Sequence, residues 1–210
     1  MASKLAVYND ALRILGERRL TSLTEARDHR YHLDDEYAVA LDYCLEQGFW
    51  NFAMRSVSMT ASASITVAFG YQHAFEKPTD WLRTYQMSNN ENFAPLLNDF
   101  KDEGGVWYAD ATPLYLRYVS NDTSYGGNLA LWSPSFAYYV AARLALKCCP
   151  TICSGSAEKL ETARNTETLA RRDARSKDAM NEPPVRAPSG SWARARQGQV
   201  PRPRSTTLGY

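Results

Sequence analysis

The sequence predicts an α+β fold, mainly α: a helical bundle with an antiparallel β-sheet insertion and an extended C-terminal arm. Three observations predict it. Apolar residues recur at helical spacing in segments 1–54 and 133–180, which are expected to form the bundle. Apolar and polar residues alternate in segment 55–132, the expected β-rich insertion. Segment 181–210, the expected arm, is rich in proline and arginine.

The composition is that of a globular chain. Of the 210 residues, 44% are hydrophobic and 22% are charged, which is enough for one core, or one core with an insertion. The N-terminus is too polar for a signal peptide, and no apolar run approaches membrane-spanning length. Three of the four cysteines crowd into residues 148–153, unlike a disulfide framework. We therefore expect synthesis in the reducing cytoplasm.

The first expected helix has a clear start, a clear end and one apolar stripe. Ser3 can cap its N-terminus, and Gly16 can end it. The apolar positions recur every three or four residues, which places them on one face; they are Leu5, Tyr8, Leu12 and Leu15.

A second, longer helix is expected after a short linker. Thr24 is the expected N-cap, with Glu25 in the first turn and Gly48 as the stop. Its core face is formed by apolar residues at helical spacing, namely Leu33, Tyr37, Ala40, Leu41, Cys44 and Leu45. Just beyond Gly48 comes a dense group of large apolar residues, Phe49, Trp50, Phe52 and Met54.

Between Arg55 and Asp122 the sequence predicts a small antiparallel sheet with one or two long hairpin loops. Short alternating runs such as WLRTYQMS, GVWYAD and PLYLRYVS are typical of strands, and glycine, proline and asparagine separate them. The large aromatic residues in apolar or alternating runs are expected to be mostly buried; they are Trp50, Phe52, Trp81 and Trp107.

Two further helices are expected to complete the bundle. Ser133 can cap the first of them, with Pro134 in its first turn and Pro150 at its end. Its core face would carry Phe136, Val140, Leu144 and Cys148. The last helix, from about Ser156 to Met180, has a thin apolar stripe of Leu160, Ala163, Ala170 and Ala174, with Leu169 alongside.

No motif selects a catalytic or metal site, and neither a cofactor nor an enzymatic activity is expected. His29 and His32 would share a helix face, but their spacing is not that of a zinc helix. The cysteine cluster lacks paired C-x-x-C spacing, so packing is the favoured role. Scattered carboxylates could in principle include a glycosidase pair, but nothing singles one out; they are Asp80, Asp99, Asp102, Glu103 and Asp110.

The arm differs from the rest of the chain in charge. Residues 181–210 hold five arginines and one acid, Glu182, out of 24 basic and 23 acidic residues in the whole chain. The arm is therefore near +4 and the remainder near −3. Such a segment buries too little apolar surface to order itself, so a partner is expected. The residues that suit a protein groove or an acidic surface are Trp192, Arg194, Arg196, Arg202, Arg204 and Tyr210.

Three motifs in a fixed order carry a resemblance to a known family. N-x-A-L-x-x-L-G at residues 9–16, E-Q-G-x-W-N-F-A at 46–53 and K-P-x-D-W-x-R at 77–83 are together fairly specific. With them, the chain resembles the head-to-tail adaptor (connector) proteins of tailed bacteriophages, of the tail tubular protein A type found in short-tailed phages. The resemblance covers about residues 4–180, and the later helices match by position more than by motif.

The resemblance implies a structural virion protein at the head–tail interface, not an enzyme. Such adaptors form a ring, a dodecamer, beneath the portal protein; they extend the channel through which genomic DNA passes and present a surface to the tail nozzle protein. In related adaptors the C-terminal segment docks on portal subunits, a role that the arm matches in character. No membrane is involved.

A second class of function stays open at this point. The basic arm could instead serve a nucleic-acid-binding packaging or regulatory protein. A third hypothesis, a cell-wall or polysaccharide hydrolase attached to the tail, has no catalytic pair to support it. The mass of the protein in solution with and without portal, alongside DNA binding at moderate salt, discriminates between the first two.

Overall fold

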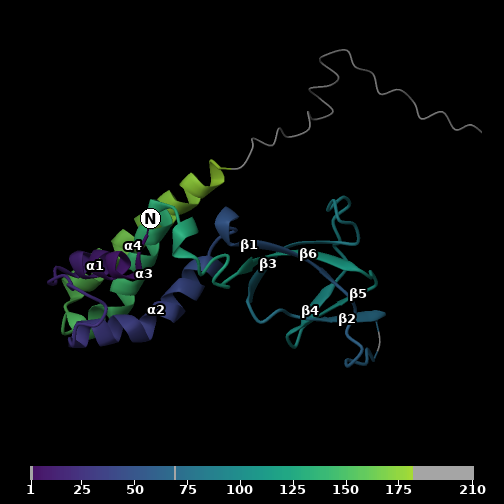
Figure 1. The fold of residues 1–210 in the computed structure, drawn as a ribbon, viewed down its shortest axis with the longest axis horizontal. Helices are drawn as coiled ribbons and strands as arrows, with labels where there is room; N and C mark the ends of the chain where they lie inside the picture. The colour runs from purple at the N-terminus through teal and green to yellow at the C-terminus, as the bar shows by residue number, and fades with distance from the viewer. Residues whose placement is uncertain (1, 69, 182–210) are drawn as a thin grey trace, which may run out of the picture.

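The computed structural model describes residues 2–68 and 70–181, and it confirms the expected fold class, α+β and mainly α. In the described residues, two α-helices precede the β-strands and two follow them (Figure 1). The helices are α1 (Lys4–Leu15), α2 (Asp28–Glu46), α3 (Pro134–Ile152) and α4 (Ala157–Ala179). The strands are β1 (Met54–Met59), β2 (His73–Glu76), β3 (Trp81–Ser88), β4 (Lys101–Glu103), β5 (Val106–Ala109) and β6 (Leu114–Ser120).

The four helices form one body with α3 at its centre. Helix α3 packs against α1, α2 and α4, and its central position explains its apolar composition. The four apolar positions expected on the core face of α3 are all buried. Helix α4 needs less apolar surface, because it covers α3 from one side only. The buried residues of its apolar stripe are Ala163, Ala170 and Ala174. Leu169, in contrast, is 64% exposed.

Most of the expected helix ends are confirmed. The Ser3 side chain accepts a hydrogen bond from the Ala6 amide, and Gly16 takes the left-handed conformation that ends α1. Ser133 caps α3 through the Phe136 amide, with Pro134 in the first turn. Ser156 caps α4 in the same way through the Lys159 amide.

Two of the expected helix ends are wrong, and each has a local cause. Helix α2 begins at Asp28, because the Glu25 carboxylate accepts hydrogen bonds from the amide and hydroxyl of Thr21, which keeps this stretch in a turn. Helix α3 continues through Pro150 to Ile152. The missing proline N–H costs one hydrogen bond in the last turn, where the helix is about to end in any case.

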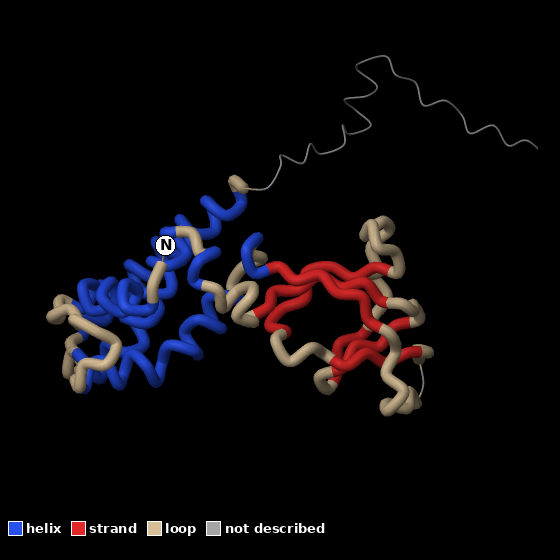
Figure 2. The backbone as a smooth tube through the Cα atoms, viewed as in Figure 1, coloured by secondary structure: helices blue, strands red, loops and turns tan. Residues whose placement is uncertain are grey.

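The β-rich segment forms two three-stranded sheets instead of the single small sheet expected. The strand order is β1-β6-β3 in one sheet and β2-β5-β4 in the other, with antiparallel pairing throughout (Figure 2). We call these two sheets the β-lobe. The chain alternates between the sheets, since β2 follows β1 but pairs with β5, so neighbouring strands in the sequence are not always neighbours in space.

The β-lobe has its own small core. Its fully buried members are Phe75, Met87, Trp107, Ala109, Leu114, Leu116 and Tyr118. The Trp81 ring meets Trp107 edge-on at 5.8 Å between centroids, and the Lys77 ammonium lies 3.5 Å above the Trp81 ring. Trp50 and Trp107 are therefore buried as expected, whereas Phe52 and Trp81 are only partly buried.

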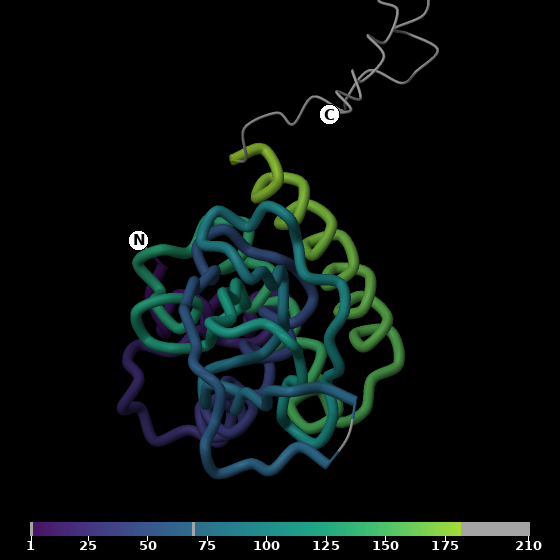
Figure 3. The backbone as a smooth tube through the Cα atoms, turned by 90° about the vertical axis from the view of Figure 1, so that its right-hand side faces the viewer, coloured from purple at the N-terminus to yellow at the C-terminus, as the bar shows by residue number. Residues whose placement is uncertain are grey.

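Hydrogen bonds join the helical body to the β-lobe at the C-terminal end of α2. Arg83 in β3 donates to the Glu46 carbonyl, with the two atoms 3.1 Å apart, and Asn121 beyond β6 donates to the Asp42 carboxylate. Figure 3 shows α4 running along one side of the molecule. The two halves thus meet where the end of α2, the start of β1 and the end of α4 come together.

Candidate interaction surface

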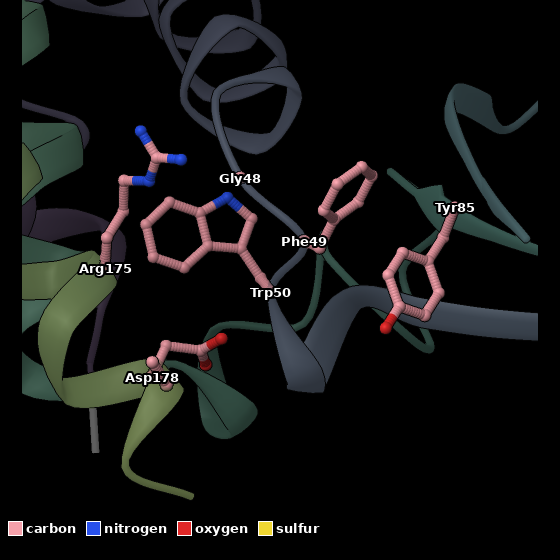
Figure 4. A pocket seen from close by; sticks show the side chains of 7 residues that line it. Gly48, Phe49, Trp50, Tyr85, Arg175 and Asp178 are labelled. Carbon is pink, nitrogen blue, oxygen red and sulfur yellow. The ribbon is translucent and has the colours of Figure 1, made fainter. Parts of the chain in front are cut away.

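The segment between α2 and β1 directs two adjacent aromatic residues in opposite directions. Gly48 makes this possible, because a Cβ there would come within 2.9 Å of the Trp50 ring. Trp50 turns into the helical body and is 1% exposed, whereas Phe49 turns outward and is 38% exposed. Figure 4 shows the two rings on different sides of this segment. One residue anchors the junction, and its neighbour is left for an external contact.

Trp50 is held by both polar and aromatic contacts. Its indole N–H donates a hydrogen bond to the carbonyl of Cys44, in the last turn of α2, at 3.0 Å. Its ring packs edge-on against Phe136 of α3 at 4.8 Å between centroids. Because the buried indole nitrogen has a partner, the ring fills the core without an unsatisfied donor.

Phe49 belongs to an exposed group of aromatic and arginine side chains. The Tyr85 ring of β3 lies 4.8 Å from the Phe49 ring, and Tyr85 is also 38% exposed. The Arg83 guanidinium lies over the Phe49 ring, with its central carbon 4.2 Å from the ring centroid. Rigid aromatic rings with arginine are the side chains that protein interfaces use most.

Two adjoining cavities extend along these rings. One of about 240 Å³ is lined by residues of the α2–β1 segment, β3 and the end of α4: Gly48, Phe49, Trp50, Tyr85, Arg175, Asp178 and Ala179 (Figure 4). The other, of about 300 Å³, is lined by Phe49, Asn51, Met54, Ser56, Tyr85 and Arg117. Phe49 and Tyr85 line both cavities. We call the two together the junction groove.

The end of α4 forms one wall of the junction groove. The Asn51 amide donates to the Asp178 carboxylate at 3.1 Å, and the Asn51 side chain donates to the Asp178 carbonyl at 3.0 Å. These bonds tie the last turn of α4 to the beginning of β1. The described chain ends at Asn181, so the basic arm of the sequence begins beside this groove.

A carboxylate network stabilises the base of the β-lobe. Asp80 accepts hydrogen bonds from Arg55 of β1 at 2.9 Å, from the Tyr118 hydroxyl at 3.0 Å and from Ser120. Burial alone would raise the pKa of Asp80, but the hydrogen bonds from Ser120, Arg55 and Tyr118 outweigh it and lower that pKa. This aspartate therefore joins β1 to β6 as a carboxylate.

Three of the four other carboxylates weighed as a glycosidase pair also have structural partners. Asp102 accepts from Lys77 at 2.8 Å and from the Trp107 indole. Asp99 accepts from the Tyr71 hydroxyl, and Asp110 accepts from the Gln72 amide. Each of these bonds joins two parts of the β-lobe, so each of the three aspartates has a structural role. Glu103 is exposed in β4.

The histidines and cysteines do not gather into a ligand set. Within the described residues, no group of three or more His, Cys, Asp or Glu side chains could hold a metal ion. All four cysteines are free and buried. Burial raises the pKa of Cys148 to about 12, so its thiol stays protonated and serves packing. The expectation of a packing role for the cluster is consistent with this burial.

The residues that the sequence singled out for partner binding lie outside the described residues. They are Trp192, Arg194, Arg196, Arg202, Arg204 and Tyr210. The junction groove was not predicted from the sequence, where Phe49 and Trp50 belong to one group of large apolar residues. Adjacent residues of an extended segment point in opposite directions, and this rule would have separated the two.

Comparison with known proteins yields no match, either to a protein family or to a curated protein. Within the described part of the chain, no helix has both the length and the apolar character needed to cross a bilayer.

Proposed function

We propose that this chain is a structural adaptor of the phage head–tail junction, a ring subunit that sits beneath the portal, extends the DNA channel and presents a surface to the tail nozzle protein. One observation carries the proposal. An exposed groove of aromatic and arginine side chains lies at the joint of the two halves, beside the end of α4 where the basic arm begins. Such surfaces suit assembly between proteins.

Two of the three resembling motifs lie at this joint in the structure. The second runs from the last residue of α2 into the buried Trp50, and the third contains Asp80, Trp81 and Arg83 of the β-lobe base. The Arg83 side chain donates to the Glu46 carbonyl, so these two motifs contact each other across the joint. The first motif lies in α1, which packs on α3 and α4 inside the helical body. This placement supports an adaptor role, because relative placement of two lobes is what a ring subunit must preserve.

The arm supplies the test of this proposal. Deleting residues 190–210 should leave the folded body intact, because the described helices and strands end before the deletion. The same deletion should abolish or greatly weaken attachment to portal-bearing heads, measured by sedimentation of heads with bound protein. A matched full-length variant, Thr206→Ala, should attach normally. Truncated protein that decorates heads at wild-type occupancy would contradict the proposed role of the arm.

The second candidate function is a nucleic-acid-binding packaging or regulatory protein. The exposed arginines of α4, among them Arg164, Arg172 and Arg175, favour it in the described residues. The two functions differ in one measurement. A channel protein should not grip phosphates, because each neutralised phosphate adds salt-dependent affinity. We expect a chain ending at Met180 to bind duplex DNA no better than a neutral control protein at physiological salt. Tight, salt-sensitive binding would support the second candidate.

A further inference from the structure

Three arginines surround the junction groove, and within the described residues none of them forms an ion pair. Arg117 of β6 and Arg175 of α4 line the two cavities, and Arg83 of β3 adjoins them. Among the described lining residues the only carboxylate is that of Asp178, which already accepts a hydrogen bond from the Asn51 amide. The groove is therefore cationic, with three positive side chains and one negative.

Aromatic rings hold two of these arginines in place. The central guanidinium carbon of Arg83 lies 4.2 Å from the centroid of the Phe49 ring. The same carbon of Arg117 lies 4.2 Å from the centroid of the Phe93 ring. A guanidinium that lies over a ring keeps its N–H groups at the rim, where a carboxylate can accept two parallel hydrogen bonds. Both arginines are thus positioned before a partner arrives, which reduces the entropy lost on binding.

The neighbours of Arg117 in the sheet do not neutralise it. In the central strand, Arg117 pairs with Ser56 of β1 on one side and with Gln86 of β3 on the other. Residues directly opposite each other in a sheet share a face, and an opposite charge there would stabilise the pair. Neither neighbour is charged, and Ser56 is short and exposed. The row therefore leaves the Arg117 guanidinium open to an external carboxylate.

The size of the junction groove suits side chains of a bound segment better than a small molecule. Its cavities of about 240 and 300 Å³ lie at or below the lower end of the range for small-molecule sites, about 300–1,000 Å³. Figure 4 shows Arg175 on one side of the Trp50 ring and both Phe49 and Tyr85 on the other. A segment that crosses the groove would meet cationic and aromatic groups in turn.

Charge narrows the choice of occupant. The arm of this chain, residues 181–210, has five arginines against one acid, so the arginines of the groove would repel it. A nucleic acid would place its phosphates near the Asp178 carboxylate. Three arginines are also few beside the roughly six to ten phosphate contacts of a typical DNA-binding protein. An acidic segment of another protein remains the occupant that the groove fits best.

We propose that the junction groove binds an acidic, extended segment of a partner protein. Apolar or aromatic side chains of that segment pack against Phe49 and Tyr85, and its carboxylates pair with Arg83, Arg117 and Arg175. This specifies the chemistry of one partner of the adaptor. The inference rests on the proposed function only for the partner being a neighbouring protein of the virion.

Binding of a designed peptide to the full chain tests the chemistry. The probe is a short fluorescein-labelled peptide of glutamates around a pair of phenylalanines, followed by fluorescence anisotropy. Replacing its glutamates with lysines, or its phenylalanines with alanines, should weaken binding on the order of tenfold or more. Amide chemical shifts should change mainly in the α2–β1 segment, β3 and the end of α4. Absence of saturable binding overturns the inference.

Charge reversal tests the location. Arg117→Glu with Arg175→Glu should weaken peptide binding on the order of tenfold or more, and Arg175→Glu alone, at an exposed position, should weaken it severalfold without lowering the melting temperature. Arg164→Glu with Arg172→Glu is the matched control, because it changes the net charge equally at residues that do not line the groove. It should change binding less than about twofold.

Three outcomes would overturn the inference. Equal losses in the groove variant and its control would show attraction by net charge alone. Binding that survives in both would place the peptide on the basic arm, which all the variants keep. A single-stranded oligonucleotide that binds more tightly than the peptide and depends on Arg117 and Arg175 would assign the groove to nucleic acid. In contrast, peptide binding that meets every expectation, with normal attachment of the groove variant to portal-bearing heads, would support the site and contradict only its role in the adaptor.

Discussion

The helical body and the β-lobe are stabilised in different ways. The body has a continuous apolar core, centred on α3, in which residues from all four helices meet. The separate core cluster of the β-lobe has only seven buried residues, and hydrogen-bonded charges complete it. Asp80 joins β1 to β6, and Lys77 joins Asp102 to the Trp81 ring. The body also has an ionised tie, since Asp34 of α2 accepts hydrogen bonds from Tyr8 and Arg30. It nevertheless depends mainly on burial of apolar surface, whereas the smaller core of the lobe leaves a larger share of its stability to such ties.

This difference suits an assembly protein with two kinds of contact. In the proposed adaptor, the apolar core of the helical body would fix its contact surfaces, and a lobe held by local polar ties would adjust to a second partner. The junction between them is the exception, since there a fully buried tryptophan and an exposed aromatic pair lie next to each other. Substitutions at the two kinds of core should therefore have separable effects.

The largest expected effect comes from the core of the body. Trp50→Ala should lower the free energy of unfolding by roughly 3–5 kcal/mol, because it removes a 1% exposed ring packed on Phe136 and leaves a cavity. Urea denaturation measures this loss, and hydrogen exchange should show it most clearly in the amides of α3.

Trp107→Ala is the matched control, because Trp107 is equally buried but lies in the core of the β-lobe. It should weaken the protection of amides in β5 and β6 more than that of amides in α3. Equal loss in both halves for both variants would show that the molecule unfolds as one unit and would break the comparison. A Trp50→Ala chain that melts within a degree or two of wild type would show that the junction is not built as described.

A smaller effect is expected from the charged ties of the lobe. Asp80→Asn should cost about 2–3 kcal/mol, since it weakens charge-assisted hydrogen bonds at a side chain that is only 12% exposed. Denaturation followed by a probe in β6 measures it. The control is Asp173→Asn. It breaks the exposed ion pair between Asp173 and Lys177, which lie one helical turn apart, and should change stability by about 0.5 kcal/mol or less. Equal effects of the two would refute the special role of Asp80.

Acid should weaken the tie at Asp80. The folded-state pKa of Asp80 is lowered, so its stabilisation is present above the unfolded-state value of about 4 and is lost as pH falls through the folded-state value. Wild-type protein should therefore lose stability below about pH 4, and Asp80→Asn should lose less over the same range. Parallel titration curves for the two proteins would place the acid sensitivity elsewhere.

Local signals in the sequence predicted most of the helices. Ser3, Ser133 and Ser156 each act on an amide three residues away, so a short stretch of sequence contains the whole interaction. Thr24 failed as a cap because Glu25 reaches back to Thr21 and stabilises a competing turn. Both the confirmed caps and the failed cap depend on neighbours within a few residues. What the sequence did not reveal is which of the competing local hydrogen bonds is more stable.

Pairing over long distances could not be predicted in the same way. Alternation identifies a strand but not its partner, and β6 pairs with β1 and β3 while β5 pairs with β2 and β4. The junction groove has the same difficulty, because its walls come from the α2–β1 segment, β3 and α4. Phe49 and Trp50 look alike in a composition-based analysis, and only the packing of α3 decides which of them is buried.

A small effect on stability is expected at the exposed side of the junction. Phe49→Ala with Tyr85→Ala should lower the free energy of unfolding by about 1 kcal/mol, because both rings are already 38% exposed and contact each other and Arg83 instead of the buried core. The same pair should reduce attachment to portal-bearing heads if the junction groove is an assembly surface, since exposed aromatic anchors contribute most to binding. Tyr31→Ala, which removes a 48% exposed ring from α2, is the matched control for the loss of an aromatic side chain. If the double variant loses several kcal/mol of stability but still occupies heads normally, these rings serve the fold and not the assembly.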